Sequence, residues 1–175
     1  MLDTQIQRDL GRAKNALQEY FINKLLIPKV YLDADWNGVR VQVLAIDRAG
    51  VGDVHAVRMI PPQGRLVEDG GAVLLGRELS SAVSEFRSLP CQFRYVAAVI
   101  DDDVTLRSQP AEQTVSQTFA EDGVGRIGVL YVDLTGDEPS VRSIIRAERF
   151  RSNTEITELA DKYVASHTAN WEVRE

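Results

Sequence analysis

The residues best placed for chemistry lie in a predicted β-hairpin whose strands run at about 39–47 and 53–60. Asp47 ends the first strand, and Asp53 and His55 open the second. Carboxylate oxygens and imidazole nitrogens are common ligands of divalent metal ions. If the protein is catalytic, these three residues are a candidate metal site. The alternative is that His55 is structural, because a metal site needs several ligands and a lone histidine rarely supplies one.

A second charged group lies further along the chain. Residues 140–151 hold four arginines and a single acid, Glu148. Arg142, Arg146 and Arg149 are therefore candidates for contacts with the phosphate groups of a nucleic acid. The alternative is that these charges protect an exposed edge strand from pairing with other chains.

The overall charge weighs against a nucleic-acid-binding protein without excluding one. The 175 residues carry a net charge of −6, whereas proteins that bind phosphate backbones usually present a basic surface. Residues 101–138 are the most acidic part, with nine acids and two arginines. A local basic surface would suffice for binding, so the arginines of 140–151 remain the candidates.

Composition and apolar runs restrict the compartment. No apolar run approaches the roughly 18 residues that a membrane-spanning helix requires. The first 21 residues are charged and amphipathic, and they lack the apolar core of a secretory signal. We expect a cytoplasmic protein without membrane contact. Its single cysteine, Cys91, excludes an intramolecular disulfide and a zinc site built from several cysteines.

The hydrophobic pattern predicts helices alternating with strands. The predicted helices cover about 4–22, 77–89, 110–121 and 152–166, and the predicted strands cover 29–35, 39–47, 53–60, 93–100, 126–134 and 141–149. Asn37-Gly38 favours a type I′ turn between the first two strands, because both residues of that turn need positive φ. The strands at 93–100 and 126–134 are almost entirely apolar, which is typical of strands covered on both faces.

Alternation along the first strand divides its side chains between two faces. Val30, Leu32 and Ala34 should share one face, with Asp33 and Asp35 on the other. The two aspartates are candidate carboxylates for a relocated catalytic site, and the alternative is that they are solvated residues on an exposed face.

The order of these elements predicts an α/β fold with a mixed central β-sheet flanked by helices on both faces. We expect residues 1–151 to form one α/β domain. Residues 152–175 should form a C-terminal helix and tail that pack on the same domain.

This order, together with three local sequence patterns, resembles the restriction-endonuclease-like (PD-(D/E)XK) nuclease superfamily. NGVRVQVLAIDRAGVGDVHAVRMI is similar to that superfamily's run of Gly, Arg, any residue, Asp, apolar residues, a turn and then Glu-x-Lys. FRYVAAVI is similar to its next strand, and EDGVGRIGVLYVDLTGDEPSVRSII resembles its closing Gly-x-Gly strand and the strand after it. The resemblance covers about residues 4–149.

The resemblance also implies where the catalytic residues should be, and this sequence departs from it there. The family's aspartate falls on Gln42, its Glu-x-Lys begins at Arg58, and a helper glutamate of the first helix corresponds to Glu19. In the family, carboxylates hold Mg²⁺, which activates water and neutralises the charge that develops on phosphate. Gln42 and Arg58 remove two negative charges and add a positive one, which disfavours a divalent cation.

Three hypotheses follow. The resemblance implies a non-catalytic or regulatory member of the superfamily that binds nucleic acid or a protein partner. No cofactor is identified for this hypothesis. The first alternative is an active Mg²⁺-dependent DNA nuclease that uses relocated carboxylates. The second is a protein–protein interaction module or homodimer in which the acidic residues 101–138 meet the arginines of 140–151.

Overall fold

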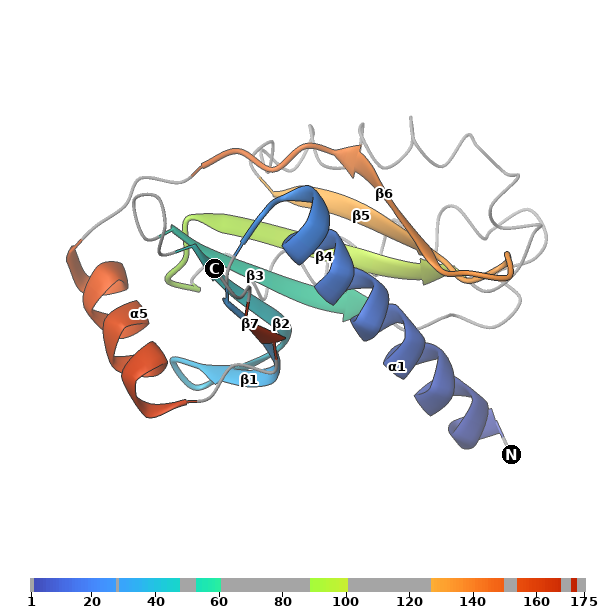
Figure 1. Ribbon diagram of the computed structural model, residues 1–175, viewed down its shortest axis with the longest axis horizontal. Helices are drawn as coiled ribbons and strands as arrows, with labels where there is room; N and C mark the ends of the chain where they lie inside the picture. The colour runs from blue at the N-terminus through green and yellow to red at the C-terminus, as the bar shows by residue number, and fades with distance from the viewer. Residues whose placement is uncertain are drawn as a thin grey trace.

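The computed structural model describes residues 2–27, 29–47, 53–60, 89–100, 127–149, 154–167 and 171–172. Within these residues the chain forms a seven-stranded sheet with two longer helices against it (Figure 1). The elements are α1 (Leu2–Glu19), the π-helix η1 (Tyr20–Lys24), β1 (Lys29–Trp36), β2 (Val39–Asp47), β3 (Asp53–Ile60), β4 (Phe93–Ile100), β5 (Gly128–Asp133), β6 (Ser140–Ile145), α5 (Thr154–Ser166) and the two-residue β7 (Trp171–Glu172).

The sheet is mixed, and its strand order is β6-β5-β4-β3-β2-β1-β7. β1, β2 and β3 pair antiparallel, as expected for a meander with short turns. β3, β4 and β5 pair parallel, and β6 returns antiparallel to β5. The predicted α/β class and mixed sheet are confirmed. Of the predicted helices, 110–121 and all but the last residue of 77–89 lie outside the described residues.

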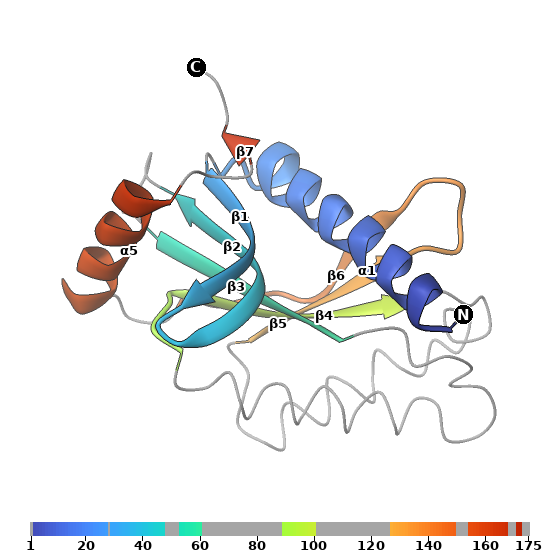
Figure 2. The ribbon, with the colours of Figure 1, turned by 90° about the horizontal axis from the view of Figure 1, so that it is seen from below.

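The core divides into two clusters because neighbouring residues of a strand point to opposite faces. The first cluster combines α1 and η1 with odd-numbered residues of the central strands: Ala13, Leu17, Phe21, Val43, Ala45, Val57, Met59, Tyr95, Ala97 and Val99. The second combines α5 with even-numbered residues: Leu44, Ile46, Val54, Ala56, Ile156 and Ala160. Figure 2 shows α1 and α5 lying against different parts of the sheet. Each helix thus covers its own set of strand side chains.

The first strand changes faces near its middle, and here the sequence prediction is wrong. Asp33 has a left-handed backbone conformation, with φ of 51°, which interrupts the regular alternation of a strand. Val30 and Leu32 therefore pack with the α1 cluster, whereas Ala34 belongs to the α5 cluster. The side chain of Asp33 is exposed, and its carboxylate lies 2.9 Å from the ammonium group of Lys14 on α1.

The turn between β1 and β2 has the predicted form. Asn37 and Gly38 both have positive φ, of 53° and 83°, as a type I′ turn requires. The backbone N–H of Gly38 donates to Asp35 Oδ1 at 2.9 Å, which links the two sides of the turn. Asp35 thus has a structural role at this turn.

The C-terminal elements differ from the prediction in their boundaries. The last long strand ends at Ile145, short of the predicted 149, and α5 begins at Thr154. The short strand β7, which was not predicted, pairs with β1 through Lys29–Glu172 and Val30–Trp171. Among the described residues, no helix combines the length and apolar character needed to cross a membrane.

Candidate functional site

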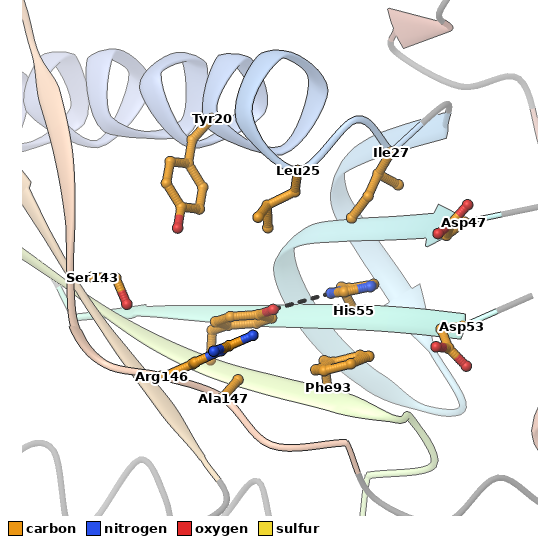
Figure 3. Close-up of a pocket in the computed structure, with 11 residues that line it drawn as sticks. Tyr20, Leu25, Ile27, Asp47, Asp53, His55, Phe93, Ser143, Arg146 and Ala147 are labelled. Carbon is orange, nitrogen blue, oxygen red and sulfur yellow. Dashed lines mark hydrogen bonds between the residues drawn. The ribbon is translucent and has the colours of Figure 1, made fainter. Parts of the chain in front are cut away.

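A recess of about 480 Å³ opens beside the N-terminal ends of the parallel strands β3 and β4 (Figure 3). We call it the β3–β4 recess. The start of η1 and the segment after η1 form one wall, and β6 with the segment after it forms the other wall. The paired ends of β2 and β3, together with β4, form the floor. Its lining residues are Tyr20, Leu25, Ile27, Asp47, Asp53, His55, Phe93, Tyr95, Ser143, Arg146 and Ala147.

Strand register brings the predicted hairpin residues to this recess. Asp47 and Asp53 are direct cross-strand partners where β2 and β3 meet. His55 follows Asp53 by two residues, so both side chains point to the same face of the sheet. His55 in turn pairs with Phe93 at the start of β4. The three residues that the sequence singled out, Asp47, Asp53 and His55, therefore line one recess.

His55 lies among aromatic rings. Its imidazole stacks on Phe93 with ring centroids 4.4 Å apart and an angle of 6° between the planes. The edge of Phe21 contacts it from α1's side, with centroids 5.9 Å apart. Burial lowers the pKa of His55 to about 4, and the negative charge of Asp53 offsets only part of that effect. The imidazole is therefore neutral near pH 7.

Tyr95 holds His55 in place from β4. Its hydroxyl oxygen lies 3.1 Å from His55 Nδ1, which is hydrogen-bonding distance. Burial also raises the pKa of Tyr95, so its hydroxyl is protonated near pH 7. The other imidazole nitrogen, Nε2, has no hydrogen-bond partner among the described residues. One polar atom of His55 is thus available to a ligand.

Two of the three predicted arginines belong to the recess or its edge. Arg149 binds both carboxylate oxygens of Asp53, with Nη2 2.8 Å from Oδ1 and Nε 3.1 Å from Oδ2. Arg146 lines the recess, and its positive charge partly counteracts the rise in the pKa of Tyr95. Arg142 is exposed on β6, opposite Tyr131, and does not line the recess. The recess therefore has one arginine of its own.

The predicted metal site is not assembled. Among the described residues, no three His, Cys, Asp or Glu side chains come close enough together to hold a metal ion. Asp53 already has a cation, the guanidinium of Arg149, on its carboxylate. Asp47, Asp53 and His55 share a recess without forming a set of ligands around one point.

The positions implied by the nuclease resemblance lie elsewhere. The pairs between β2 and β3 run from Asp47–Asp53 to Val43–Val57. Just beyond the last pair, Gln42 Oε1 accepts a hydrogen bond of 2.8 Å from the backbone N–H of Met59. Arg58 is half-buried on β3, and Glu19 is exposed at the end of α1. None of Gln42, Arg58 and Glu19 lines the β3–β4 recess.

Backbone features at the recess were not predicted from the sequence. η1 inserts a π-turn at the end of α1, and such turns are frequent at functional sites. Leu26, beside the lining residues Leu25 and Ile27, has a left-handed backbone with φ of 55°, which is unusual for a leucine. Backbone strain of this kind clusters at ligand-binding sites.

Gly128 allows the wall of the recess formed by the segment after β6 to pack against β4 in the floor. A Cβ atom at this position would lie 2.8 Å from Ala147 Cβ and 2.9 Å from Tyr95 Cδ1, closer than real Cβ atoms come. The absence of a side chain on β5 therefore lets the segment after β6 pack against Tyr95. This contact brings Ala147 and its neighbour Arg146 to the recess.

Sequence reasoning missed four polar or aromatic lining residues: Tyr20, Phe93, Tyr95 and Ser143. The spacing of Phe93 and Tyr95 was a usable signal, since residues two apart on a strand share a face. Nothing in the sequence indicated that this face would meet Tyr20 from α1's end or Ser143 from β6.

Comparison with known proteins gives no function. No protein-family description matches the sequence, and no curated protein matches it. Among solved structures, the fold is similar to SPO1766, a protein of unknown function from Silicibacter pomeroyi. The similarity has a TM-score of 0.47 and 11% sequence identity, and it covers 83% of this chain and 77% of that one.

Proposed function

We propose that this chain is a non-catalytic binding protein with a restriction-endonuclease-like core. The order of its elements and its mixed sheet are compatible with such a core, and the sequence resemblance supplies the positions at which catalysis should occur. The binding surface that we propose is β6 and the segment after it, where Arg142 and Arg146 are exposed and offer positive charge to a nucleic acid.

The observation that carries the proposal is the hydrogen bond between the side chain of Gln42 and the backbone of β3. At the position of the family's metal-binding aspartate, the side-chain oxygen accepts the N–H of Met59 at 2.8 Å. This bond completes the backbone pairing where β2 and β3 stop pairing with each other. A side chain committed to the sheet contributes no charge to a metal site, and Arg58 adds a cation close by along β3.

A cleavage and binding experiment tests the proposal. Plasmid, linear and single-stranded DNA are incubated with the full chain and Mg²⁺ or Mn²⁺, alongside a known nuclease and a chelator control. We expect no cleavage. We also expect salt-sensitive DNA binding, measured by fluorescence anisotropy, that weakens in the double variant Arg142→Ala, Arg146→Ala. Cleavage that survives repurification would overturn the non-catalytic proposal, and absence of DNA binding would redirect it to a protein partner.

A second candidate function is an active Mg²⁺-dependent nuclease with relocated carboxylates. One observation favours it: Asp47, Asp53 and His55 line the same recess. It requires Mg²⁺ to displace Arg149 from Asp53, so metal should raise the melting temperature of the native chain and leave Asp53→Ala unaffected. A melting temperature that does not respond to Mg²⁺ or Mn²⁺ removes this candidate.

A further inference from the structure

The β3–β4 recess has two chemically different ends. In Figure 3, Ser143 and Arg146 lie at one end and Asp47 and Asp53 at the other, with His55 and Phe93 between them. One end therefore offers a guanidinium and a hydroxyl group, which bind an acidic group well. The other end carries two carboxylates, and that of Asp53 is already paired with Arg149.

The middle of the recess is built for a flat ring. The imidazole of His55 is nearly parallel to the rings of both neighbours, at 6° to Phe93 and 15° to Tyr95. The aliphatic side chains of Leu25 and Ile27 line the opposite wall. Parallel aromatic rings facing aliphatic side chains form a slot that suits a planar, apolar or heteroaromatic group.

We propose that the β3–β4 recess is a small-molecule site for a planar organic anion, whose ring lies over His55 and whose acidic group binds Arg146 and Ser143. A ligand of this class is a nucleoside monophosphate or an aromatic carboxylate. Both share a flat ring and a single acidic end, and both fit a volume of about 480 Å³. The inference does not depend on DNA binding or on the absence of nuclease activity.

His55 contributes hydrogen bonding without adding charge. Its Nδ1 is engaged by the Tyr95 hydroxyl at 3.1 Å, which fixes the orientation of the ring. Its Nε2 has no partner among the described residues, and because it points outward in the imidazole plane it can bond only to a polar substituent that extends past the edge of the stacked ring. Arg146 is then the residue that supplies the positive charge, since Arg149 is held by Asp53.

The two ends make a prediction about specificity. A second acidic group on the far side of the ring would lie beside the carboxylates of Asp47 and Asp53, where Arg149 is already bound to Asp53 and Arg146, at the other end, is too far to pair with it. Benzoate should therefore bind more tightly than terephthalate, which carries carboxylates at both ends of its ring. A site that attracted anions only through general positive charge would prefer the dianion.

Titration calorimetry with defined probes tests the proposal. The ring-plus-acid probes are adenosine 5′-monophosphate and benzoate, the ring-only probes are adenosine and benzyl alcohol, and the acid-only probes are inorganic phosphate and acetate. We expect one ring-plus-acid probe to bind at least about tenfold more tightly than its ring-only and acid-only counterparts. Which of the two binds identifies the acidic group as phosphate or carboxylate.

Variants locate the binding. Arg146→Ala should weaken binding of the successful probe by about tenfold or more, because a charge-assisted hydrogen bond is lost. Arg40→Ala is the matched control: it removes the same charge from an exposed position at the far end of β2, and it should leave the affinity unchanged. Ser143→Ala should weaken binding less than Arg146→Ala does.

Three results would overturn the inference. They are the absence of binding by both ring-plus-acid probes, equal binding by phosphate or acetate alone, and equal losses in Arg146→Ala and Arg40→Ala. Each variant is checked by circular dichroism and thermal melting. Arg146 belongs to both proposals, so the single variant Arg142→Ala separates them: Arg142 does not line the recess, and its loss should weaken DNA binding and leave the affinity for the probe unchanged.

Discussion

The two ends of the β2–β3 pair use polar side chains in opposite ways. At one end, Gln42 turns inward to satisfy the backbone N–H of Met59. At the other end, Asp47, Asp53 and His55 face a recess. The sequence resemblance directs attention to the first end, whereas in the structure the open surface with both charged and aromatic residues lies at the second. The role of a polar residue in a strand therefore depends on where it lies relative to the paired part of that strand.

The electrostatics of the two ends differ as well. Near Gln42 the charged neighbour along β3 is Arg58, and its positive charge disfavours a metal ion. At the recess end, positive and negative side chains lie on opposite sides of a neutral imidazole. At the Gln42 end the polar side chain is hydrogen-bonded to the backbone. At the recess end the charges are separated, and Nε2 of His55 has no partner among the described residues.

The largest effect that would sharpen this contrast is the pH dependence that His55 gives to stability. Its pKa is about 4 in the folded protein and near 6.5 when unfolded, so the unfolded chain binds a proton at higher pH. The stability from this group is present above pH 6.5 and is lost as pH falls toward 4. The loss should be about 3 kcal/mol, measured by denaturant unfolding at pH 7 and pH 4.

His55→Phe provides the comparison for that measurement. It keeps a buried ring and removes the titrating group, so the unfolding free energy of the native protein minus that of the variant should fall by about 3 kcal/mol between pH 7 and pH 4. The carboxylates titrate in both proteins and cancel in this difference. An NMR titration of His55 with a midpoint near 6.5 would contradict the buried, neutral imidazole.

An intermediate effect is expected at the Gln42 end. Gln42→Ala leaves the N–H of Met59 without its acceptor, and an unsatisfied, partly buried donor costs roughly 1–3 kcal/mol. Gln42→Glu keeps an acceptor oxygen at the same place and should lose less stability. Hydrogen exchange at the Met59 amide reports the bond directly: it should become faster in Gln42→Ala. Unchanged exchange would show that Gln42 does not complete the sheet.

The smallest effect concerns the ion pair at the edge of the recess. Arg149→Ala removes a bidentate partner from Asp53, yet exposed pairs of this kind contribute only about 0.2–1 kcal/mol. Thermal melting at low and high salt should show a small destabilisation that salt reduces further. A loss well above 1 kcal/mol would mean that Arg149 holds the segment after β6 in place.

Much of the sheet could be predicted because its signals are local. Alternation and the Asn37-Gly38 turn predicted β1 and β2 within one residue, and continuous apolar runs located β4 and β5. The reversal of faces at Asp33 could not be predicted, because aspartate is enriched among left-handed residues but adopts that conformation in only a small minority of cases. A two-residue strand such as β7 has no periodicity to detect.

The site was predictable only where residues are close in the sequence. Asp47, Asp53 and His55 were grouped correctly in space because a hairpin fixes their register. The pair between Asp53 and Arg149 joins positions 96 residues apart, and the stack of His55 on Phe93 depends on a parallel crossover. Such contacts follow from tertiary packing, which short-range patterns do not encode. The choice between binding and catalysis therefore stays a prediction.

The close approach at Gly128 has a consequence for sequence variation. Any side chain there would push Ala147 away from Tyr95, and Arg146 would move with it. Natural relatives of this chain that keep an arginine at position 146 should also keep glycine at 128, whereas relatives that have lost the arginine are free to replace the glycine. If these two residues, 18 positions apart, are kept or lost together among relatives, the glycine is retained because it places Arg146 at the recess.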